Sequence, residues 1–419
     1  MDNIAFLNIF SYLRMLKTIV IMIVPMRIVN IIKKILFLGD IIMIKIAHVQ
    51  LLPLLTGVQR VSLDELSRLN KCDFESYIIC KEYGPLIEEC IKNNIKFIYC
   101  KNLVRNISIT QDFRAFWCLY KLFKKNKFDI VHTHSSKTGV IGRIAAKLAG
   151  VPMVIHTVHG FSFPSAKGKL TKLIYFLMEW LGTKCSDKVI CLHDKDRNFA
   201  KKYLGAKNKQ LEIIPNGVDI MKFHPPTEYE KKIIREELHI PSEAIVIGMV
   251  GRLWKQKNPK LLMNSALSIL EANKNIHLVF VGDGEFRSEL EFTAENYSIK
   301  NQVHILGWRS DSNHILKAFD IFVLPSLWEG MPLAILEAQA TGIPCIVSNI
   351  QGNNHLVQHN INGLLFSSNE EKDLTLCLNK LIDDYSLRYS LGNAGLANVR
   401  KRFSIEDRVN KIIKCYNPK

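Results

Sequence analysis

The segment "DIFVLPSLWEGMPLAILEAQATG" (Asp320–Gly342) carries the signals of a strand, a tight loop and a helix in direct succession. Its first part is a short apolar run of the kind that forms a buried strand. Its second part predicts a helix with Pro332 at the first position, where the missing N–H costs nothing, and with Gly342 at the C-terminal end. Gly330 and Met331 form the loop between them, so the N–H groups at the helix start can bind an anionic or oxygen-rich ligand.

Similar apolar runs recur along the chain, separated by stretches that can form helices. They are Ile44–Gln50, Ser76–Cys80, Lys96–Cys100, Asp129–His134, Met153–Gly160 and Lys188–His193, and later Ile245–Leu253, His277–Gly284, Val303–Gly307, Asp320–Ser326 and Pro344–Ile350. Near-continuous apolar strands that alternate with helices indicate a parallel sheet covered on both faces. Because 419 residues exceed one ordinary core, we predict an α/β protein with two doubly wound, Rossmann-like parallel-sheet domains. The first covers residues 43–215 and the second residues 216–400, with a final helical segment over 401–419.

Residues 1–42 differ from the rest of the chain. The stretch Thr18–Ile32 is apolar but interrupted by Pro25 and Arg27, and it is too short for a membrane span of roughly 20 residues. Basic residues surround it, as in a segment that lies on a membrane surface. The alternative is that translation begins at Met43, and the sequence leaves both readings open.

The positive charge is concentrated in one half of the chain. The formal net charge is +17, and residues 1–210 hold 33 lysines and arginines against 15 acids, whereas residues 211–419 hold 23 against 24. Such asymmetry favours an N-terminal half that faces an anionic membrane or a nucleic acid. Within it, Asp112–Phe128 combines aromatic residues with Lys121, Lys124 and Lys125. This segment is either a buried helix with a solvated basic end or a helix that docks on anionic lipid.

Two pairs of charged residues stand out in the second half. Glu329 and Glu337 lie in the core-like strand–loop–helix segment, where an acid is costly unless something pairs with it. Arg252 and Lys257, in "VGRLWKQKNP" (Val250–Pro259), follow another predicted strand and suit a diphosphate. Ligands of doubly wound sheets bind beyond the carboxyl ends of the strands. The residues placed there, which point to one cleft between the domains, are Gly57, His134, His159, Arg252, Gly284 and Glu329.

Several patterns argue against other kinds of site. The chain contains neither G-x-x-x-x-G-K-[ST] nor G-x-G-x-x-G, which excludes a P-loop and the dinucleotide fingerprint. The histidines of "HTH" (His132–His134) and "HTVH" (His156–His159) rarely complete a metal site alone, and "DKD" (Asp194–Asp196) precedes a helical pattern, which favours helix capping. The ten cysteines form no C-x-x-C pair, so we read them as reduced cytoplasmic thiols.

These residues resemble those of a known family. "VGRL", Lys257 and "NP", followed by "SLWEGMPLAILEA" (Ser326–Ala338), are similar to the family 4 glycosyltransferases, retaining enzymes of the GT-B fold. The spacing of Glu329 and Glu337, with seven residues between them, is that family's signature. The segment Asp129–Phe161 looks like the subgroup that builds capsular polysaccharides, O-antigens and related lipid-linked glycans. The resemblance covers nearly the whole chain from Met43.

The resemblance implies a donor-binding role for most of the cleft residues. Arg252 and Lys257 are expected to hold the diphosphate of a nucleotide sugar, and Glu337 the ribose hydroxyls. Glu329 and the backbone of Gly330, Met331, Pro332 and Leu333 are expected to grip the transferred sugar. Gly57 matches the glycine loop near the diphosphate, although Thr56 replaces the second glycine that is common there. His159 matches a histidine near the reacting sugar, and Asn216 and Gly217 match a loop that lines the cleft. Gly284 is expected to shape the base pocket, and His134 to lie on the acceptor side with Lys121, Lys124 and Lys125.

The resemblance therefore implies retaining transfer of a hexose or N-acetylhexosamine from a nucleotide diphosphate. The subgroup favours uracil as the base, and so a UDP-sugar donor, with guanine as the alternative. The expected acceptor is a saccharide on a polyprenyl diphosphate, used in bacterial surface polysaccharide synthesis. We expect no cofactor, no metal and no nucleic-acid partner, and a peripheral location on the inner face of the cytoplasmic membrane. The resemblance also implies that the C-terminal helix crosses back to the first domain. Two alternatives remain: a sugar phosphorylase of the same fold, for which no lysine context for pyridoxal is visible, and a non-catalytic basic membrane- or nucleic-acid-binding protein.

Overall fold

A computed structural model describes residues 43–104, 108–161 and 168–417. The apolar and basic segment over residues 1–42 lies outside the described residues, so neither reading of it is tested.

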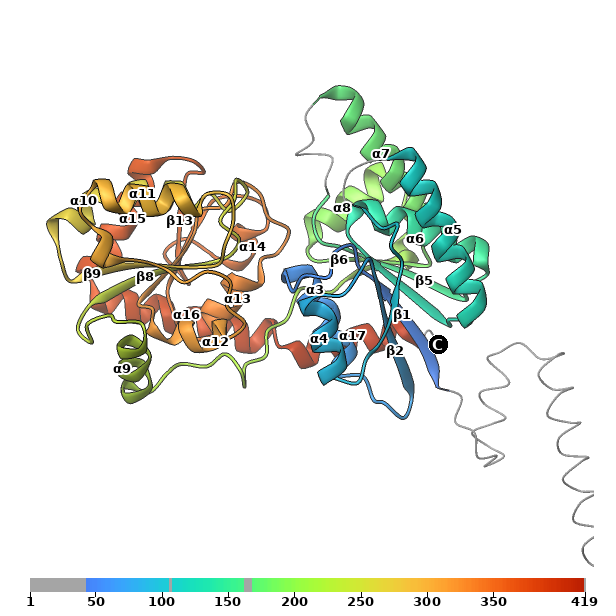
Figure 1. The fold of residues 1–419 in the computed structure, drawn as a ribbon, viewed down its shortest axis with the longest axis horizontal. Coiled ribbons are helices and arrows are strands. Elements are labelled where there is room, and N and C mark those ends of the chain that lie inside the picture. Colours follow the sequence, from blue (N-terminus) through green and yellow to red (C-terminus); the bar gives the residue numbers. More distant parts are fainter. Residues whose placement is uncertain (1–42, 105–107, 162–167, 418–419) are drawn as a thin grey trace, which may run out of the picture. The chain divides into compact units, whose positions relative to one another are not determined.

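The first domain is built on a seven-stranded sheet with the order β3-β2-β1-β4-β5-β6-β7 (Figure 1). The pairs β2–β3, β1–β4, β4–β5, β5–β6 and β6–β7 are parallel. The strands are β1 (Ile44–Val49), β2 (Phe74–Cys80), β3 (Lys96–Tyr99), β4 (Ile130–His134), β5 (Met153–Val158), β6 (Lys188–Cys191) and β7 (Leu211–Ile213). The helices are α3 (Gly57–Ser67), α4 (Pro85–Lys92), α5 (Ile109–Asn126), α6 (Ser136–Ala149), α7 (Lys169–Lys184) and α8 (Asp194–Tyr203).

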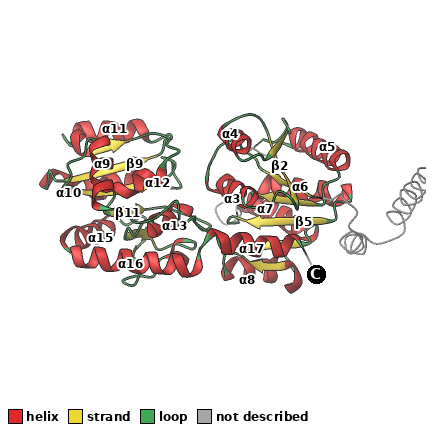
Figure 2. Cartoon of the chain, turned by 90° about the horizontal axis from the view of Figure 1, so that it is seen from below, coloured by secondary structure: helices red, strands yellow, loops and turns green. Residues whose placement is uncertain are grey.

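The second domain repeats this design with a six-stranded parallel sheet of order β10-β9-β8-β11-β12-β13. Its strands are β8 (Ile245–Val250), β9 (Ile276–Val281), β10 (Val303–Ile305), β11 (Ile321–Leu324), β12 (Cys345–Ser348) and β13 (Leu364–Phe366). Its helices are α9 (Glu228–Glu237), α10 (Pro259–Ala272), α11 (Arg287–Asn296), α12 (Ser312–Ile315), α13 (Leu333–Ala340), α14 (Asn353–Leu356), α15 (Glu371–Asp383) and α16 (Tyr385–Arg402). Figure 2 shows strands between layers of helices in each domain. Two doubly wound parallel sheets confirm the predicted fold class.

The sheet of the second domain has a separate hydrophobic core on each face. One core contains Val246, Phe322 and Leu336, and the other contains Ile247, Phe280 and Leu378. Alternate residues of β8 therefore face opposite cores, which is why its sequence is continuously apolar. The start of α13 differs by one residue from the prediction. Pro332 is the N-cap with an extended backbone (ψ 125°), and the helix begins at Leu333, whereas Gly342 follows the helix in the left-handed conformation (φ 78°) as predicted.

The last helix, α17 (Ile405–Tyr416), contacts the first domain through buried polar groups. Arg408 donates from Nε and Nη2 to Glu65 Oε1 on α3, at 2.9 and 2.6 Å. Its Nη1 donates to the carbonyls of Ile214 and Pro215. The Tyr416 hydroxyl lies 2.8 Å from His48 Nε2 on β1. The C-terminal helix is thus fixed to the first sheet by an ion pair and a histidine contact.

None of the helices in the described part of the chain is long and apolar enough to cross a membrane.

Candidate active site

The structure brings Lys257 and Glu329 into direct contact. Lys257 lies in the loop between β8 and α10, and Glu329 in the loop between β11 and α13. Because β8 and β11 are neighbours in a parallel sheet, these loops emerge side by side. Lys257 Nζ lies 2.5 Å from Glu329 Oε1, which also accepts a hydrogen bond from Ser326 Oγ at 2.7 Å. The ion pair fixes both side chains at the carboxyl ends of the strands.

Arg252 is exposed just after β8. Its guanidinium carbon lies 4.6 Å from the centre of the Trp254 ring, which orients the planar group by a cation–π contact. The stem of Lys257 runs past Gly251 (φ 155°), where a Cβ would lie 3.4 Å from Lys257 Cε, an ordinary van der Waals contact. The loop therefore presents two different cations, the planar guanidinium of Arg252 and the compact ammonium group of Lys257.

Glu337 lies within α13 and is only 6% exposed. Its Oε1 is 3.5 Å from Arg60 Nη1 on α3, a helix of the first domain. Burial raises the pKa of Glu337, and the positive charge of Arg60 opposes that rise. Arg60 was not predicted from the sequence, although it lies three residues after Gly57, in the segment "LTGVQR" (Leu55–Arg60). Nothing in that segment indicated a partner on a distant helix.

The loop before α13 approaches the first domain closely. A Cβ on Gly330 would lie 2.2 Å from the carbonyl oxygen of His159, so only glycine fits there. Asn216 is buried and donates from Nδ2 to the Met331 carbonyl at 2.7 Å. Asn216 therefore fastens the backbone that precedes the helix, a more specific position than the lining role expected of it. Leu333 begins α13 and packs against the core of the domain.

The other predicted glycines differ in what they do. Gly217 packs against α17, since a Cβ there would lie 2.8 Å from Ser404 O. Gly284 (φ 158°) packs against Leu253, whose carbonyl oxygen would lie 2.3 Å from a Cβ. Gly57 is the first residue of α3, and a Cβ there would meet nothing within 4 Å. The contact of Gly57 with a diphosphate stays a prediction.

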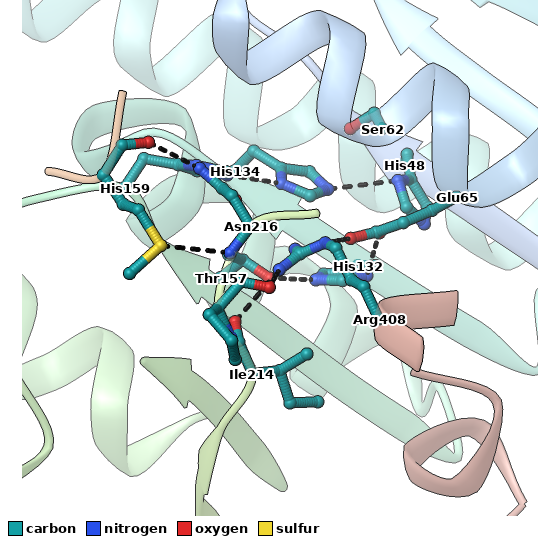
Figure 3. A network of polar contacts seen from close by, with 12 residues as sticks. His48, Ser62, Glu65, His132, His134, Thr157, His159, Ile214, Asn216 and Arg408 are labelled. Atoms are coloured by element: carbon teal, nitrogen blue, oxygen red, sulfur yellow. Dashed lines mark hydrogen bonds and ion pairs between the residues drawn. The ribbon is translucent and has the colours of Figure 1, made fainter. Parts of the chain in front are cut away.

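The predicted histidines lie together in the first domain (Figure 3). His134 is fully buried, with its Nδ1 3.0 Å from His159 Nε2 and its Nε2 3.1 Å from His48 Nδ1. His134 therefore contacts His159 rather than presenting an open face to an acceptor. Burial, with a smaller effect of the Arg408 charge, lowers the pKa of His159 to about 3, so its imidazole is neutral.

Among the described residues, one cluster brings together side chains that could bind a metal ion. The ligand atoms of His48, Glu65, His132 and His134 all lie within 4.8 Å of one another. The ring nitrogens of the three histidines, however, lie at hydrogen-bond distance from Tyr416, Thr157, His159 or each other. We therefore read the cluster as a hydrogen-bonded network.

The "DKD" residues are the first three residues of helix α8, so the prediction that they cap a helix is wrong by one position. The cap itself is His193, whose Nδ1 accepts from the Asp196 N–H at 3.2 Å. Asp196 is buried, and its burial raises the pKa of the carboxyl to about 7.

Lys121, Lys124 and Lys125 are exposed on α5. The residues Leu119 and Phe123 on its other side are buried, and Phe113 and Trp117 are exposed. Sequence reasoning did not single out α7, which shows a longer apolar face. Its exposed large side chains are Leu173, Ile174, Leu177, Trp180 and Leu181.

Comparisons with known proteins agree with this geometry. The model described as "Glycosyltransferase Family 4" matches residues 55–222, and the model described as "Glycosyl transferases group 1" matches residues 230–397. An Escherichia coli protein named UDP-Gal:alpha-D-GlcNAc-diphosphoundecaprenol alpha-1,3-galactosyltransferase is 48% identical over 89% of this chain and 96% of its own length.

A Campylobacter jejuni protein named N,N'-diacetylbacillosaminyl-diphospho-undecaprenol alpha-1,3-N-acetylgalactosaminyltransferase is 31% identical over 66% of this chain and 74% of its own length. Among solved structures, HepE from Anabaena in complex with UDP has a TM-score of 0.74 at 20% identity and covers 89% of this chain and 99% of its own. This structural likeness concerns the fold.

Proposed function

Because the chain belongs to the family 4 glycosyltransferases and has the GT-B fold, we propose that it transfers galactose from UDP-galactose to N-acetylglucosamine on a polyprenyl diphosphate. The proposal extends to this chain the donor and acceptor named for its 48% identical relative. The names of the Escherichia coli and Campylobacter jejuni proteins both specify an alpha-1,3 linkage and a diphosphoundecaprenol carrier. We propose the same linkage here, made with retention of configuration for surface polysaccharide synthesis.

The single observation that carries the proposed mechanism is the contact between Lys257 and Glu329. Arg252 and Lys257 hold the diphosphate and stabilise the negative charge that develops on it when the bond to the sugar C1 breaks. Glu329 accepts hydrogen bonds from sugar hydroxyls, and Glu337 from the ribose. Because Lys257 contacts Glu329, the sugar and the diphosphate are held on either side of one ion pair.

In the proposed mechanism, an acceptor hydroxyl attacks C1 on the face from which the diphosphate leaves. The C1–O bond electrons pass to UDP, and the acceptor proton passes to the departing phosphate oxygen. His159, next to Gly330, donates a hydrogen bond to the sugar. We propose that no metal takes part, because the side chains of Arg252 and Lys257 supply the positive charge at the diphosphate.

Thermal shift measurements test the donor site. We expect UDP and UDP-galactose to raise the melting temperature in the presence of EDTA, whereas GDP and ADP do so much less. Replacing Glu337 by glutamine removes a charged acceptor for the ribose hydroxyls, and we expect the UDP affinity to fall about tenfold. Glu289→Gln, on the exposed surface of α11, is the matched control. A shift that EDTA abolishes would contradict the metal-free site, and equal shifts with all nucleotides would contradict the assignment of uracil.

We also propose that the first domain docks on the inner face of the cytoplasmic membrane through α5 and α7. Helix α7 exposes Leu173, Leu177 and Trp180 at intervals of three or four residues, which places them on one face. Lys169, Lys172 and Lys184 flank this face, and α5 adds exposed lysines. Figure 1 shows α5, α6 and α7 next to one another. Apolar side chains framed by lysines suit an anionic lipid surface.

Vesicle co-sedimentation tests this face. We expect binding to vesicles of phosphatidylethanolamine and phosphatidylglycerol, weakened by salt. On the membrane, burial of the Leu177 side chain in lipid would contribute about 1.5–3 kcal/mol. Leu177→Glu removes this contribution and places a negative charge against anionic lipid, so we expect binding to fall at least tenfold. Leu376→Glu is the matched control, because Leu376 is an exposed leucine on α15, outside the proposed face. Equal binding of both variants would contradict the proposed face.

A further inference from the structure

A chain of aromatic side chains joins His159 to Tyr416 at the end of the C-terminal helix. Figure 3 shows its histidine members His48, His132, His134 and His159. His159 Nε2 lies 3.0 Å from His134 Nδ1, and His134 Nε2 lies 3.1 Å from His48 Nδ1. His48 Nε2 lies 2.8 Å from the hydroxyl of Tyr416. The same hydroxyl is 2.9 Å from His132 Nδ1. Every step is therefore within hydrogen-bond distance.

The sheet explains how these residues meet. Strand β4 lies between β1 and β5, and His48 is in register with His132, and His134 with Thr157. His132 and His134 are two residues apart on β4, so their side chains share one face of the sheet. Tyr416, the last residue of α17, reaches the same face. His48, His132 and His134 are fully buried, and Tyr416 is 3% exposed.

The positions of the protons allow two arrangements of the hydrogen bonds from Tyr416 to His159. Burial lowers the pKa of His48 to about 3, and lowers the pKa of His132 and His134 well below the usual value. Each imidazole is therefore neutral, with one N–H and one lone pair. Each contact needs one donor and one acceptor, and Tyr416 has one proton to donate. Reversing one contact consequently reverses all contacts from Tyr416 to His159.

Glu65 favours one of the two arrangements. Its Oε2 lies 3.9 Å from His132 Nδ1, and this buried oxygen has no hydrogen-bond partner among the described residues. A buried negative oxygen favours a proton on His132 Nδ1. Tyr416 then accepts from His132 Nδ1–H, and we place its own proton toward His48 Nε2, the other ring nitrogen at hydrogen-bond distance from the hydroxyl. The Thr157 hydroxyl, 2.8 Å from His132 Nε2, donates to that nitrogen.

The remaining contacts follow without further choice. His48 Nδ1–H donates to His134 Nε2, and His134 Nδ1–H donates to His159 Nε2. His159 must then carry its own proton on Nδ1. We propose that Tyr416 and Glu65 are positioning residues that fix His159 as the Nδ1–H tautomer, so that its Nδ1–H donates to the transferred sugar. This inference rests on the proposed function for the role of His159, whereas the tautomer itself does not depend on the reaction.

The tautomer is measured directly by ¹⁵N NMR of the histidine side chains, with the His159 signals assigned through a His159→Gln variant. We expect wild-type His159 to be protonated on Nδ1. Tyr416→Phe removes the hydroxyl that sets the direction of the chain, so we expect a mixture of tautomers at His159. We also expect kcat/KM for the sugar donor to fall about tenfold. UDP binding should be unchanged, because UDP lacks the transferred sugar that His159 contacts.

Thr133→Val is the matched control. The Thr133 hydroxyl is buried on β4 and lies 2.9 Å from His156 Nδ1, outside the chain of contacts. We expect this variant to leave the tautomer of His159 unchanged. If Tyr416→Phe does not fold, Thr157→Val is the second test. It removes the hydroxyl that donates to His132 Nε2, so we expect a mixture of His159 tautomers. Thr157→Ser keeps that hydroxyl and is expected to show the single tautomer.

Three results would overturn the inference. They are a wild-type His159 protonated on Nε2, a tautomer that is unchanged in both Tyr416→Phe and Thr157→Val, and a stoichiometric metal in the purified protein. A metal would take the histidine lone pairs that the chain of hydrogen bonds uses. Absence of galactose transfer by the wild type would instead count against the proposed function, and the NMR result would still decide the tautomer.

Discussion

Replacing Lys257 by methionine is expected to lower kcat for sugar transfer by about 10²–10³-fold. Methionine keeps the apolar stem that runs past Gly251 and removes the charge. The variant loses the cation that stabilises the departing diphosphate and the 2.5 Å contact that holds Glu329. The loss should appear in steady-state kinetics with UDP-galactose and a lipid-linked acceptor.

Lys255→Met is the matched control for this measurement. Lys255 is exposed in the same loop, two residues before Lys257. We expect it to keep activity within about twofold of the wild type, as for surface substitutions in general. Wild-type kcat in Lys257→Met would show that the leaving group is stabilised elsewhere.

Replacing Glu65 by glutamine is expected to destabilise the protein by about 3–5 kcal/mol. Glu65 and Arg408 are both almost fully buried, and two guanidinium nitrogens donate to one carboxylate oxygen. Glutamine leaves the Arg408 charge buried without an opposite charge. Urea denaturation followed by fluorescence should show an earlier transition for the first domain and α17.

Glu89→Gln is the matched control, because Glu89 pairs with the exposed Lys92 on α4. Such surface pairs contribute about 0–1 kcal/mol. The double variant Glu65→Gln/Arg408→Met should recover part of the lost stability, because it removes both charges. A loss below about 1 kcal/mol in Glu65→Gln alone would contradict the structural role given to this ion pair.

The repeating strands and the charged loops could be predicted from the sequence because their signals are local. The apolar runs predicted β8, β9 and β11 to within a few residues, and the Gly-Met-Pro loop predicted the start of α13 to within one. The edge strands β7 and β13, of three residues each, were missed, whereas the equally short β10 was predicted because the apolar run Val303–Gly307 extends beyond it.

The histidine chain could not be predicted in this way. It depends on the order of β1, β4 and β5 in the sheet and on the return of α17, which brings Tyr416 next to His48. The partner of Glu337 was missed for the same reason, since Arg60 lies 277 residues away in the sequence. Contacts between distant elements require the topology and not the local pattern.

The sequence left two alternatives open, a non-catalytic basic binding protein and a sugar phosphorylase of the same fold. The chain belongs to a glycosyltransferase family, and a 48% identical relative is named as a galactosyltransferase, which argues against a non-catalytic binding protein. The phosphorylase alternative is not favoured by either family match. We propose that the basic first half faces a membrane-bound acceptor rather than a nucleic acid, and the vesicle experiment tests this.

The most direct test is to incubate the purified full-length protein with UDP-galactose and N-acetylglucosamine-diphosphoundecaprenol, with EDTA present, and to analyse the lipid product by mass spectrometry and NMR. The proposed function predicts one added galactose with an α-anomeric signal and one UDP released per transfer. UDP-N-acetylgalactosamine, run in parallel, should be a poorer donor. A β-linked product, or no product from folded protein that binds UDP, would contradict the account.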